Sequence, residues 1–166
     1  MQQPKEMNDI DKGYKTTSLF SLFRARFSSF VDYIKERVMW RKLMHQKQNT
    51  RIHSFAHIVN PQNVYLGENS HINIHCYVCG GDSTKIYIGD NVLMGPNVNI
   101  LGDDSQSKGD IVIGNDVWLG ANSIIYAGVH IADGCVIGAG SVVYDNIDTP
   151  YSIVGGIPAK VLAYRK

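Results

Sequence analysis

Histidine side chains are the clearest candidates for chemistry, because an imidazole can act as a general base or bind a metal near neutral pH. The chain has six histidines in 166 residues, and four of them fall between positions 53 and 75. His71 and His75 are four residues apart, a spacing that unites side chains on a helix but not on a short strand and corner. We therefore expect no metal site here, and we take His75 as a candidate general base.

Carboxylates offer a second candidate base. Asp103 and Asp104 stand side by side in the segment 101–110, Leu-Gly-Asp-Asp-Ser-Gln-Ser-Lys-Gly-Asp. Burial would let such a carboxyl group accept a proton by raising its pKa, although adjacent aspartates in a Gly/Ser-rich loop are more often turn formers. Asp82 and Ser83, in the segment 79–85, are candidates to contact an acceptor molecule.

Composition excludes several other classes. The three cysteines, Cys76, Cys79 and Cys135, include no second C-x-x-C pair, so we expect neither a zinc site nor a disulfide framework. A net charge of +1 without a basic face argues against a nucleic-acid partner. The start of the chain has no secretory signal, and no uncharged apolar stretch reaches about 18 residues. We expect a cytoplasmic protein.

A six-residue repeat must position these groups from about residue 64 onward. Its first position is a large aliphatic residue or Met, its fifth is Ser, Val, Cys or Ile, and Gly, Asn, Asp and Ala dominate in between. The first positions are Leu66, Ile72, Ile88, Met94, Ile113, Leu119, Ile125, Ile131, Ile137 and Val143.

Six residues make one short strand and one corner, and three such units close a triangular coil of about 18 residues. First and fifth side chains then fill the prism, while corners need positive φ, which Gly, Asn and Asp tolerate. This pattern predicts a mainly β fold, a parallel β-helix of hexapeptide repeats. A side chain at the fourth position, such as that of His75, should face outward.

Residues 18–48 follow a different pattern. Phe20, Phe23, Phe27 and Phe30 are spaced three or four apart, charged residues fill the other face, and Ser18 is a plausible N-cap. We therefore expect an N-terminal amphipathic α-helical segment within residues 1–50, and a β-helix domain with a C-terminal tail over residues 51–166. The apolar stripe either packs against protein or makes a peripheral membrane contact, at the inner face in a cytoplasmic protein.

The repeat resembles the hexapeptide-repeat (left-handed β-helix) acyltransferase superfamily over about residues 64–166. The most specific stretches begin at Ile88 (Ile-Gly-Asp-Asn-Val-Leu-Met-Gly-Pro-Asn-Val-Asn-Ile), Ile113 (Ile-Gly-Asn-Asp-Val-Trp-Leu-Gly-Ala-Asn) and Ile137 (Ile-Gly-Ala-Gly-Ser-Val-Val). Gly155-Gly-Ile-Pro-Ala-Lys-Val-Leu looks like the segment that ends the coil in the sugar O-acetyltransferase branch. The resemblance implies a left-handed β-helix, a homotrimer with clefts between prisms, acetyl-CoA as co-substrate, no metal, and direct acyl transfer by a general base.

Family positions for the acetyl-CoA contacts carry over residue by residue. They fall on Gly120, Ala121, Ala139, Tyr144, Asp145 and Lys160. Small residues at 121 and 139 suit the pantetheine arm, and Lys160 suits the phosphates of CoA. Tyr144 and Asp145 depart from the small-hydroxyl and Lys pair that is common there. Trp118 is expected either to line the cofactor groove or to fill a subunit contact.

The family's usual catalytic histidine is missing. It belongs in the loop after Gly-Pro-Asn-Val, and counting forward puts Ser105 in its place. Three alternatives stay open. In the first, His75 is the general base; it maps onto an acceptor-binding Asn of the family and would also contact substrate, together with Asn97. In the second, Asp103 or Asp104 is the base. In the third, the protein is a trimeric scaffold or binding module without activity.

The resemblance thus implies an acetyl-CoA-dependent O-acetyltransferase acting on a sugar hydroxyl, with a carbohydrate acceptor in surface polysaccharide or lipid-linked glycan synthesis. An acetyltransferase for serine, an amino sugar or an antibiotic is a further alternative.

Overall fold

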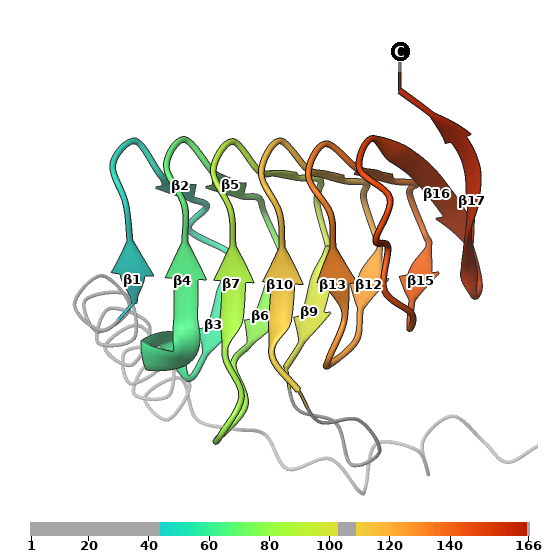
Figure 1. Cartoon of the computed structure of the whole chain (residues 1–166). Helices are drawn as coiled ribbons and strands as arrows, with labels where there is room; N and C mark the ends of the chain where they lie inside the picture. Colours follow the sequence, from blue (N-terminus) through green and yellow to red (C-terminus); the bar gives the residue numbers. More distant parts are fainter. Residues whose placement is uncertain (1–43, 103–108, 166) are drawn as a thin grey trace, which may run out of the picture. The chain divides into compact units, whose positions relative to one another are not determined.

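A computed structural model describes residues 44–102 and 109–165 of the chain (Figure 1). These residues form a parallel β-solenoid whose short strands stack into three sheets. Sheet 1 consists of β1 (His45–Gln46), β4 (Val64–Leu66), β7 (Ile86–Ile88), β10 (Ile111–Ile113) and β13 (His130–Ile131). Sheet 2 consists of β2 (Arg51–Ile52), β5 (His71–Ile72), β8 (Leu93–Met94), β11 (Trp118–Leu119), β14 (Val136–Ile137), β16 (Ser152–Gly156) and β17 (Ala159–Tyr164). Sheet 3 consists of β3 (His57–Val59), β6 (Tyr77–Cys79), β9 (Asn99–Leu101), β12 (Ile124–Ile125) and β15 (Val142–Val143).

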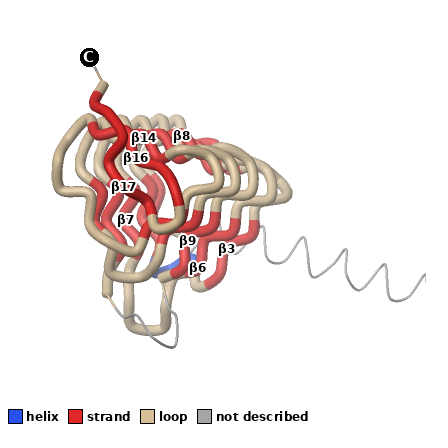
Figure 2. Tube along the Cα trace, turned by 90° about the vertical axis from the view of Figure 1, so that its right-hand side faces the viewer, coloured by secondary structure: helices blue, strands red, loops and turns tan. Residues whose placement is uncertain are grey.

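Each turn of the solenoid crosses the three sheets in order and returns one strand further along. Ile113 in β10 pairs in register with Ile131 in β13, eighteen positions later, as the repeat predicts. Seen along the coil, the described residues outline a triangle (Figure 2). In Figure 1 the front strands point up, the chain passes over the top to the rear, and successive turns lie further right. The coil is therefore left-handed.

The predicted core is confirmed. Side chains at the first and fifth repeat positions are buried, and the five consecutive aliphatics on β10 to β14 are at most 2% exposed. They are Ile113, Leu119, Ile125, Ile131 and Ile137. At the C-terminal end β16 continues sheet 2, and β17 turns back antiparallel along it.

Three edges join the sheets, and we name them by position. The first edge, between sheets 1 and 2, comprises residues 47–50, 67–70, 89–92, 114–117 and 132–135. The second edge, between sheets 2 and 3, comprises residues 53–56, 73–76, 95–98, 120–123 and 138–141. The third edge, between sheets 3 and 1, carries every insertion that lengthens a turn, including the 3-10 helix η3 (Pro61–Asn63) and the segment 80–85.

Corner glycines serve two different needs. The fourth repeat position has positive φ throughout the regular turns, and Asn, Asp, His or Gly occupies it. Glycine at the second position has an ordinary φ but lies against the next turn. A Cβ atom on Gly120 would come 2.5 Å from the backbone nitrogen of Ala139 and 2.7 Å from the carbonyl oxygen of Ile137. Where glycine stands at the second position, close stacking of turns rather than a left-handed conformation therefore explains it.

The solenoid begins earlier than the sequence pattern indicates. β1 occupies His45–Gln46, inside the range expected to be helical up to residue 48, and Met44 is buried at the end of the core. Gln46 pairs with Leu66 of the next turn, so backbone register extends the coil although the aliphatic residue is absent. The rest of the expected helix lies outside the described residues. No helix within the described ranges is long and apolar enough to cross a membrane.

Candidate functional site

The second edge gathers four of the predicted site residues in one column. His75, Asn97, Ala121 and Ala139 occupy its successive corners. Backbone hydrogen bonds join these corners: the Asn97 N–H donates to a carbonyl in the corner of His75 at 3.1 Å, and the Gly140 N–H donates to the Ala121 carbonyl at 2.8 Å. Parallel stacking thereby brings together residues that are more than sixty positions apart in the sequence.

His75 is held in an exposed and well-defined position. Its φ of 57° places it in the left-handed region, so the side chain leaves the corner toward solvent. The His75 ring stacks on Phe55 at a centroid distance of 5.9 Å, and the His75 N–H donates to the Phe55 carbonyl at 3.1 Å. The Phe55 N–H donates in turn to Nδ1 of His53 at 3.2 Å. Phe55, which the sequence analysis missed, therefore supports the imidazole from the preceding turn.

Small residues leave the second edge smooth beyond Asn97. Gly120, Ala121 and Ala139 follow one another there, with Ala139 exposed and Ala121 half-buried. Turn stacking alone accounts for glycine at position 120, as its blocked Cβ position shows. The alanines at 121 and 139 have short side chains, and together they form a shallow strip against which an extended arm can lie.

Two of the remaining predicted cofactor residues, Tyr144 and Asp145, lie on the other side of sheet 3, whereas Lys160 lies in β17, where it pairs with Gly155. Tyr144 and Asp145 are exposed on the third edge, where the Tyr144 ring stacks on Tyr126 at 4.5 Å. Lys160 in β17 places its Nζ 3.9 Å from Oδ2 of Asp145, and both side chains are largely exposed. The carboxylate thus offsets part of the charge that Lys160 would offer to a phosphate.

The predicted acceptor contacts do not all converge. Asp82 and Ser83 are exposed on the third edge, and Asn60 Nδ2 donates to Asp82 Oδ1 at 3.3 Å. Strand β6 runs between the corner of His75 and this segment, so the width of sheet 3 separates the two groups. Asp103 and Asp104, with Ser105, lie outside the described residues.

The histidines and cysteines are distributed around the prism. His71 faces outward on sheet 2, and burial together with Arg51 and His53 lowers its pKa. Cys76 is a core residue whose pKa is raised by burial. All three cysteines are free. Within the described ranges, no group of three or more His, Cys, Asp or Glu side chains is placed to hold a metal ion.

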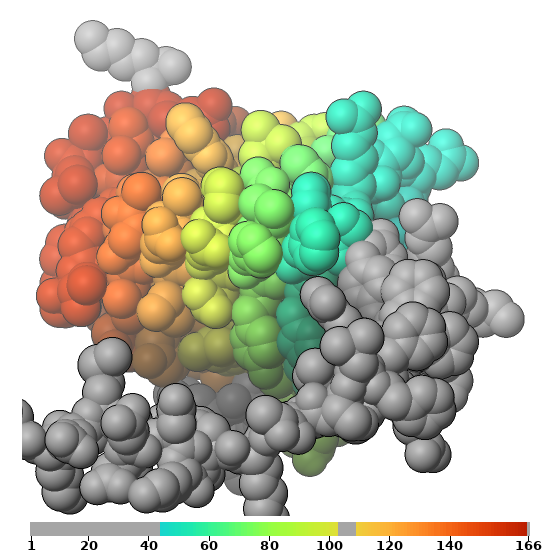
Figure 3. Space-filling view, turned by 180° about the vertical axis from the view of Figure 1, so that it is seen from behind, coloured from blue at the N-terminus to red at the C-terminus, as the bar shows by residue number. Residues whose placement is uncertain are grey.

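Two further surface features complete the described domain. Trp118 and Leu93 are each more than half exposed side by side on the outer face of sheet 2. Sheet 1 has a groove of about 670 Å³ on its outer face, next to the first edge. This groove does not include any predicted site residue, because sheet 1 does not border the second edge. Figure 3 shows the domain from the side opposite to Figure 1, with successive turns side by side.

Comparison with known proteins agrees with this geometry. Residues 110–145 match the family model described as bacterial transferase hexapeptide (six repeats). The galactoside O-acetyltransferase of Escherichia coli K12 is 35% identical over 111 residues, which cover 60% of this chain and 53% of that protein. The curated relatives also include chloramphenicol acetyltransferases that match over shorter stretches. The chain spans about half or less of the length of these curated relatives.

Solved structures extend the match to most of the chain. A maltose O-acetyltransferase from Clostridium difficile is 32% identical, with a TM-score of 0.63 over 81% of this chain and 76% of that one. A hexapeptide-repeat acetyltransferase from Vibrio cholerae, solved with acetyl coenzyme A, is 28% identical, with a TM-score of 0.67 over 80% of this chain and 78% of that one.

The unbroken hexapeptides, the left-handed solenoid and these matches define the class: the chain belongs to the hexapeptide-repeat acyltransferase superfamily. Within that superfamily it fits the branch that contains the galactoside and maltose O-acetyltransferases.

Proposed function

We propose that the protein transfers an acetyl group from acetyl-CoA to a hydroxyl of a sugar, in surface polysaccharide or lipid-linked glycan synthesis. The observation that carries this proposal is the column on the second edge, where an exposed histidine precedes a strip of small residues. Relatives named as galactoside and maltose O-acetyltransferases support the choice of a sugar acceptor. A relative solved with acetyl coenzyme A supports the choice of donor.

His75 acts in this proposal as the general base. It takes the proton of the acceptor hydroxyl while that oxygen attacks the thioester carbonyl carbon. The tetrahedral intermediate then collapses, the C–S bond breaks, and the imidazolium returns its proton to the departing CoA thiolate. Backbone N–H groups would stabilise the oxyanion, and binding both substrates along one edge would supply much of the rate through proximity.

The conformation of His75 is compatible with a role in the site. The other fourth positions with positive φ between residues 69 and 140 are Asn, Asp or Gly. Asparagine is the commonest choice for this left-handed conformation, and His75 is the exception in the series. Histidine is one of the residue types that tolerate this region, so the corner can present an exposed imidazole without marked strain.

Acetyl-CoA fits the strip only in part. Ala121 and Ala139 leave space for the pantetheine arm, and Lys160 is the nearest candidate for a phosphate. Asp145 weakens that contact, so we expect modest affinity for the donor.

A homotrimer with clefts between neighbouring prisms is part of the proposal. The exposed pair Leu93 and Trp118 on sheet 2 supports it, because adjacent exposed apolar side chains can be covered by another protein surface. A cytoplasmic location, with the N-terminal segment at the inner membrane face, suits a lipid-linked acceptor and remains a prediction.

The decisive experiment measures thioester release from acetyl-CoA over a panel of sugar acceptors, with serine and chloramphenicol as non-sugar acceptors. His75→Asn should lower kcat by about 10²-fold or more, because a general base contributes about 10²–10⁴. The same variant should keep or slightly raise the free energy of unfolding, since Asn suits the left-handed corner. Unchanged kcat in a folded His75→Asn variant would remove His75 from the role of general base.

An Asp103→Ala/Asp104→Ala double variant provides the comparison. If it loses turnover while His75→Asn retains it, the base lies in the segment 101–110 instead. The second candidate function, a scaffold without activity, is favoured by Ser105 at the position of the family's usual histidine. Calorimetry that shows no affinity for acetyl-CoA would support the scaffold and reject the transferase.

A further inference from the structure

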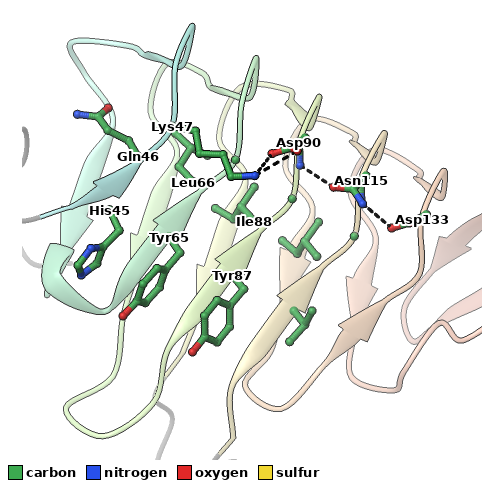
Figure 4. A pocket seen from close by; sticks show the side chains of 15 residues that line it. His45, Gln46, Lys47, Tyr65, Leu66, Tyr87, Ile88, Asp90, Asn115 and Asp133 are labelled. Atoms are coloured by element: carbon green, nitrogen blue, oxygen red, sulfur yellow. Dashed lines mark hydrogen bonds and ion pairs between the residues drawn. The ribbon is translucent and has the colours of Figure 1, made fainter.

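The groove on the outer face of sheet 1 has a floor and two chemically different walls (Figure 4). Glycines at the second repeat position form the floor: Gly67, Gly89 and Gly114. The close approach of the next turn requires glycine at each of them, so the floor carries no side chains; Gly67 is buried, and Gly89 and Gly114 are partly exposed. The groove runs across several turns along the coil axis, which suits an extended ligand better than a compact one.

One wall is a stack of aromatic rings. His45 and Tyr65 lie 4.4 Å apart with nearly parallel planes, and Tyr65 and Tyr87 follow at 4.8 Å. Because the rings cover one another, they present their edges to the groove, and the tyrosines add hydroxyl groups. Lys85 lies over the Tyr65 ring with its Nζ 5.9 Å from the centroid.

The aromatic stack ends at Tyr87, because the next strand, β10, has no ring at the corresponding position. Register places Val112 next to Tyr87, and His130 follows on β13. Adjacent strands are about 4.8 Å apart. A ring placed above Val112 would therefore continue the stack at its existing spacing, with one face against Tyr87. Figure 4 shows Tyr65 and Tyr87 side by side along this row.

The other wall is a ladder of polar side chains on the first edge. Lys47 Nζ donates to Asp90 at 3.0 and 3.2 Å, and the Asp90 N–H donates to Asn115 Oδ1 at 2.9 Å. The Asn115 N–H donates to Asp133 Oδ1 at 2.6 Å. Carboxylates have about four acceptor sites each, and an amide adds donors, so this wall retains capacity for hydroxyl groups.

Charge narrows the class of ligand. The lining residues carry two carboxylates, Asp90 and Asp133, and a single ammonium group, Lys47. Lys85 adds a second ammonium group beside the aromatic wall, so the charges around the groove balance, which favours an uncharged ligand over phosphates and acidic glycans. An extended shape, a vacant stacking position and a wall of hydroxyl-binding groups together suit a neutral carbohydrate chain.

We propose that this groove binds a neutral linear oligosaccharide, with one sugar ring on the face of Tyr87 above Val112. Sheet 1 does not border the second edge, so the bound segment would be remote from the residue that receives the acetyl group. The groove would then favour long acceptors over short ones. The role of the groove as an acceptor subsite rests on the proposed transferase activity. Binding of the oligosaccharide can be tested without any activity.

Calorimetry with the full-length protein tests the binding. Maltose, maltohexaose, cellohexaose and hexagalacturonate are the probes. We expect a hexasaccharide of neutral sugars to bind measurably and maltose to bind at least tenfold more weakly. Val112→Tyr should weaken hexasaccharide binding roughly three- to tenfold or more, because the added ring occupies the vacant stacking position. Val112→Thr, of nearly equal size, should bind like the wild type.

Four results would overturn the proposal: no heat with either neutral hexasaccharide, maltose bound as tightly as the preferred hexasaccharide, equal affinity in the Val112→Tyr variant, or tighter binding of hexagalacturonate. Tyr87→Ala should also weaken binding, which covers the case in which Val112→Tyr fails to fold. If the protein binds the sugar but releases no thiol from acetyl-CoA, the proposed transferase activity is rejected and the proposed binding groove stands. If acetyl transfer depends neither on acceptor length nor on Val112→Tyr, the role of the groove as an acceptor subsite is rejected.

Discussion

Residues 111–143 and residues 45–102 build the same three-sided prism from different sequences. In the first region every turn is eighteen residues long, and aliphatic side chains fill each first position. In the second region insertions lengthen the turns at the third edge, and Gln46 and Ile52 stand at first positions without full burial. The outer faces differ as well, because rings from the first two turns stack on one another: His45 on Tyr65 and His57 on Tyr77.

This difference teaches where a solenoid can carry specificity. Turn stacking demands little beyond inward aliphatics and permissive corners, so the outward positions of any turn are free to vary. In the regular region those positions are small at the second edge, where the donor is proposed to lie. In the N-terminal region several of them are aromatic or histidine, such as Tyr65, Tyr77 and His57, which suits recognition of an acceptor.

The largest expected effect concerns the core. Ile125→Ala should lower the free energy of unfolding by about 2–5 kcal/mol, since Ile125 is fully buried. The matched change Ile52→Ala, in a partly exposed first position of the N-terminal region, should cost about 1 kcal/mol. Urea unfolding at one protein concentration measures both. Equal losses would mean that the two regions share one uniformly packed core.

The second prediction separates the two kinds of corner glycine in the regular region. Gly120→Ala should cost about 1–3 kcal/mol, because the new methyl group meets backbone atoms of the next turn. Gly140→Asn should be nearly neutral: no atom lies within 4 Å of its Cβ position, and Asn tolerates a φ of 69°. The same unfolding measurement applies, and a reversed order of the two variants would contradict the stacking explanation.

The regular region could be predicted almost completely from the sequence. Its six-residue period is unbroken, so the inward positions, the corners and the order of the sheets all follow from Ile113 to Val143. The first turn could not be predicted in this way. Gln46 occupies a first repeat position because its backbone pairs with that of Leu66. Backbone hydrogen bonds do not depend on side-chain type, so the sequence does not show that the repeat extends to this turn.

The candidate site was predictable only in part, since four of its predicted residues occupy successive corners of one edge and several others lie elsewhere. The position of each residue within the order of hexapeptide repeats assigns four of them to the second edge, where the structure also places them: His75, Asn97, Ala121 and Ala139. Phe55 was missed because its turn lacks the repeat signature. The sheet 1 groove was missed for another reason: its tyrosines are far apart in sequence, and only the register between turns brings Tyr65 and Tyr87 into contact.

A smaller effect tests how the regular region meets the donor. Asp145→Asn should lower the Michaelis constant for acetyl-CoA about two- to threefold, because Lys160 would then keep its full charge for a phosphate. Lys160→Gln should raise it by a similar factor. Both effects should shrink at high salt, since the two side chains are exposed. If Asp145→Asn raises the constant instead, Asp145 itself contacts the donor.

The smallest expected effect lies in the N-terminal region, at the ion pair of Lys47 and Asp90. The hydrogen bond from the Lys47 ammonium, with one from the Glu68 N–H, lowers the pKa of Asp90. A carboxyl group with a lowered folded-state pKa stabilises the fold above the ordinary aspartate pKa of about 4. That contribution is lost as the pH falls through the lowered value.

Lys47→Gln removes the main cause of this shift. The variant should therefore melt slightly below the wild type near neutral pH, and the two melting temperatures should converge as the pH drops below about 4. Thermal unfolding from about pH 6 to about pH 3 measures the difference. A gap that stays constant over this range would show that Lys47 acts through packing of its stem along the groove rather than through the Asp90 carboxylate.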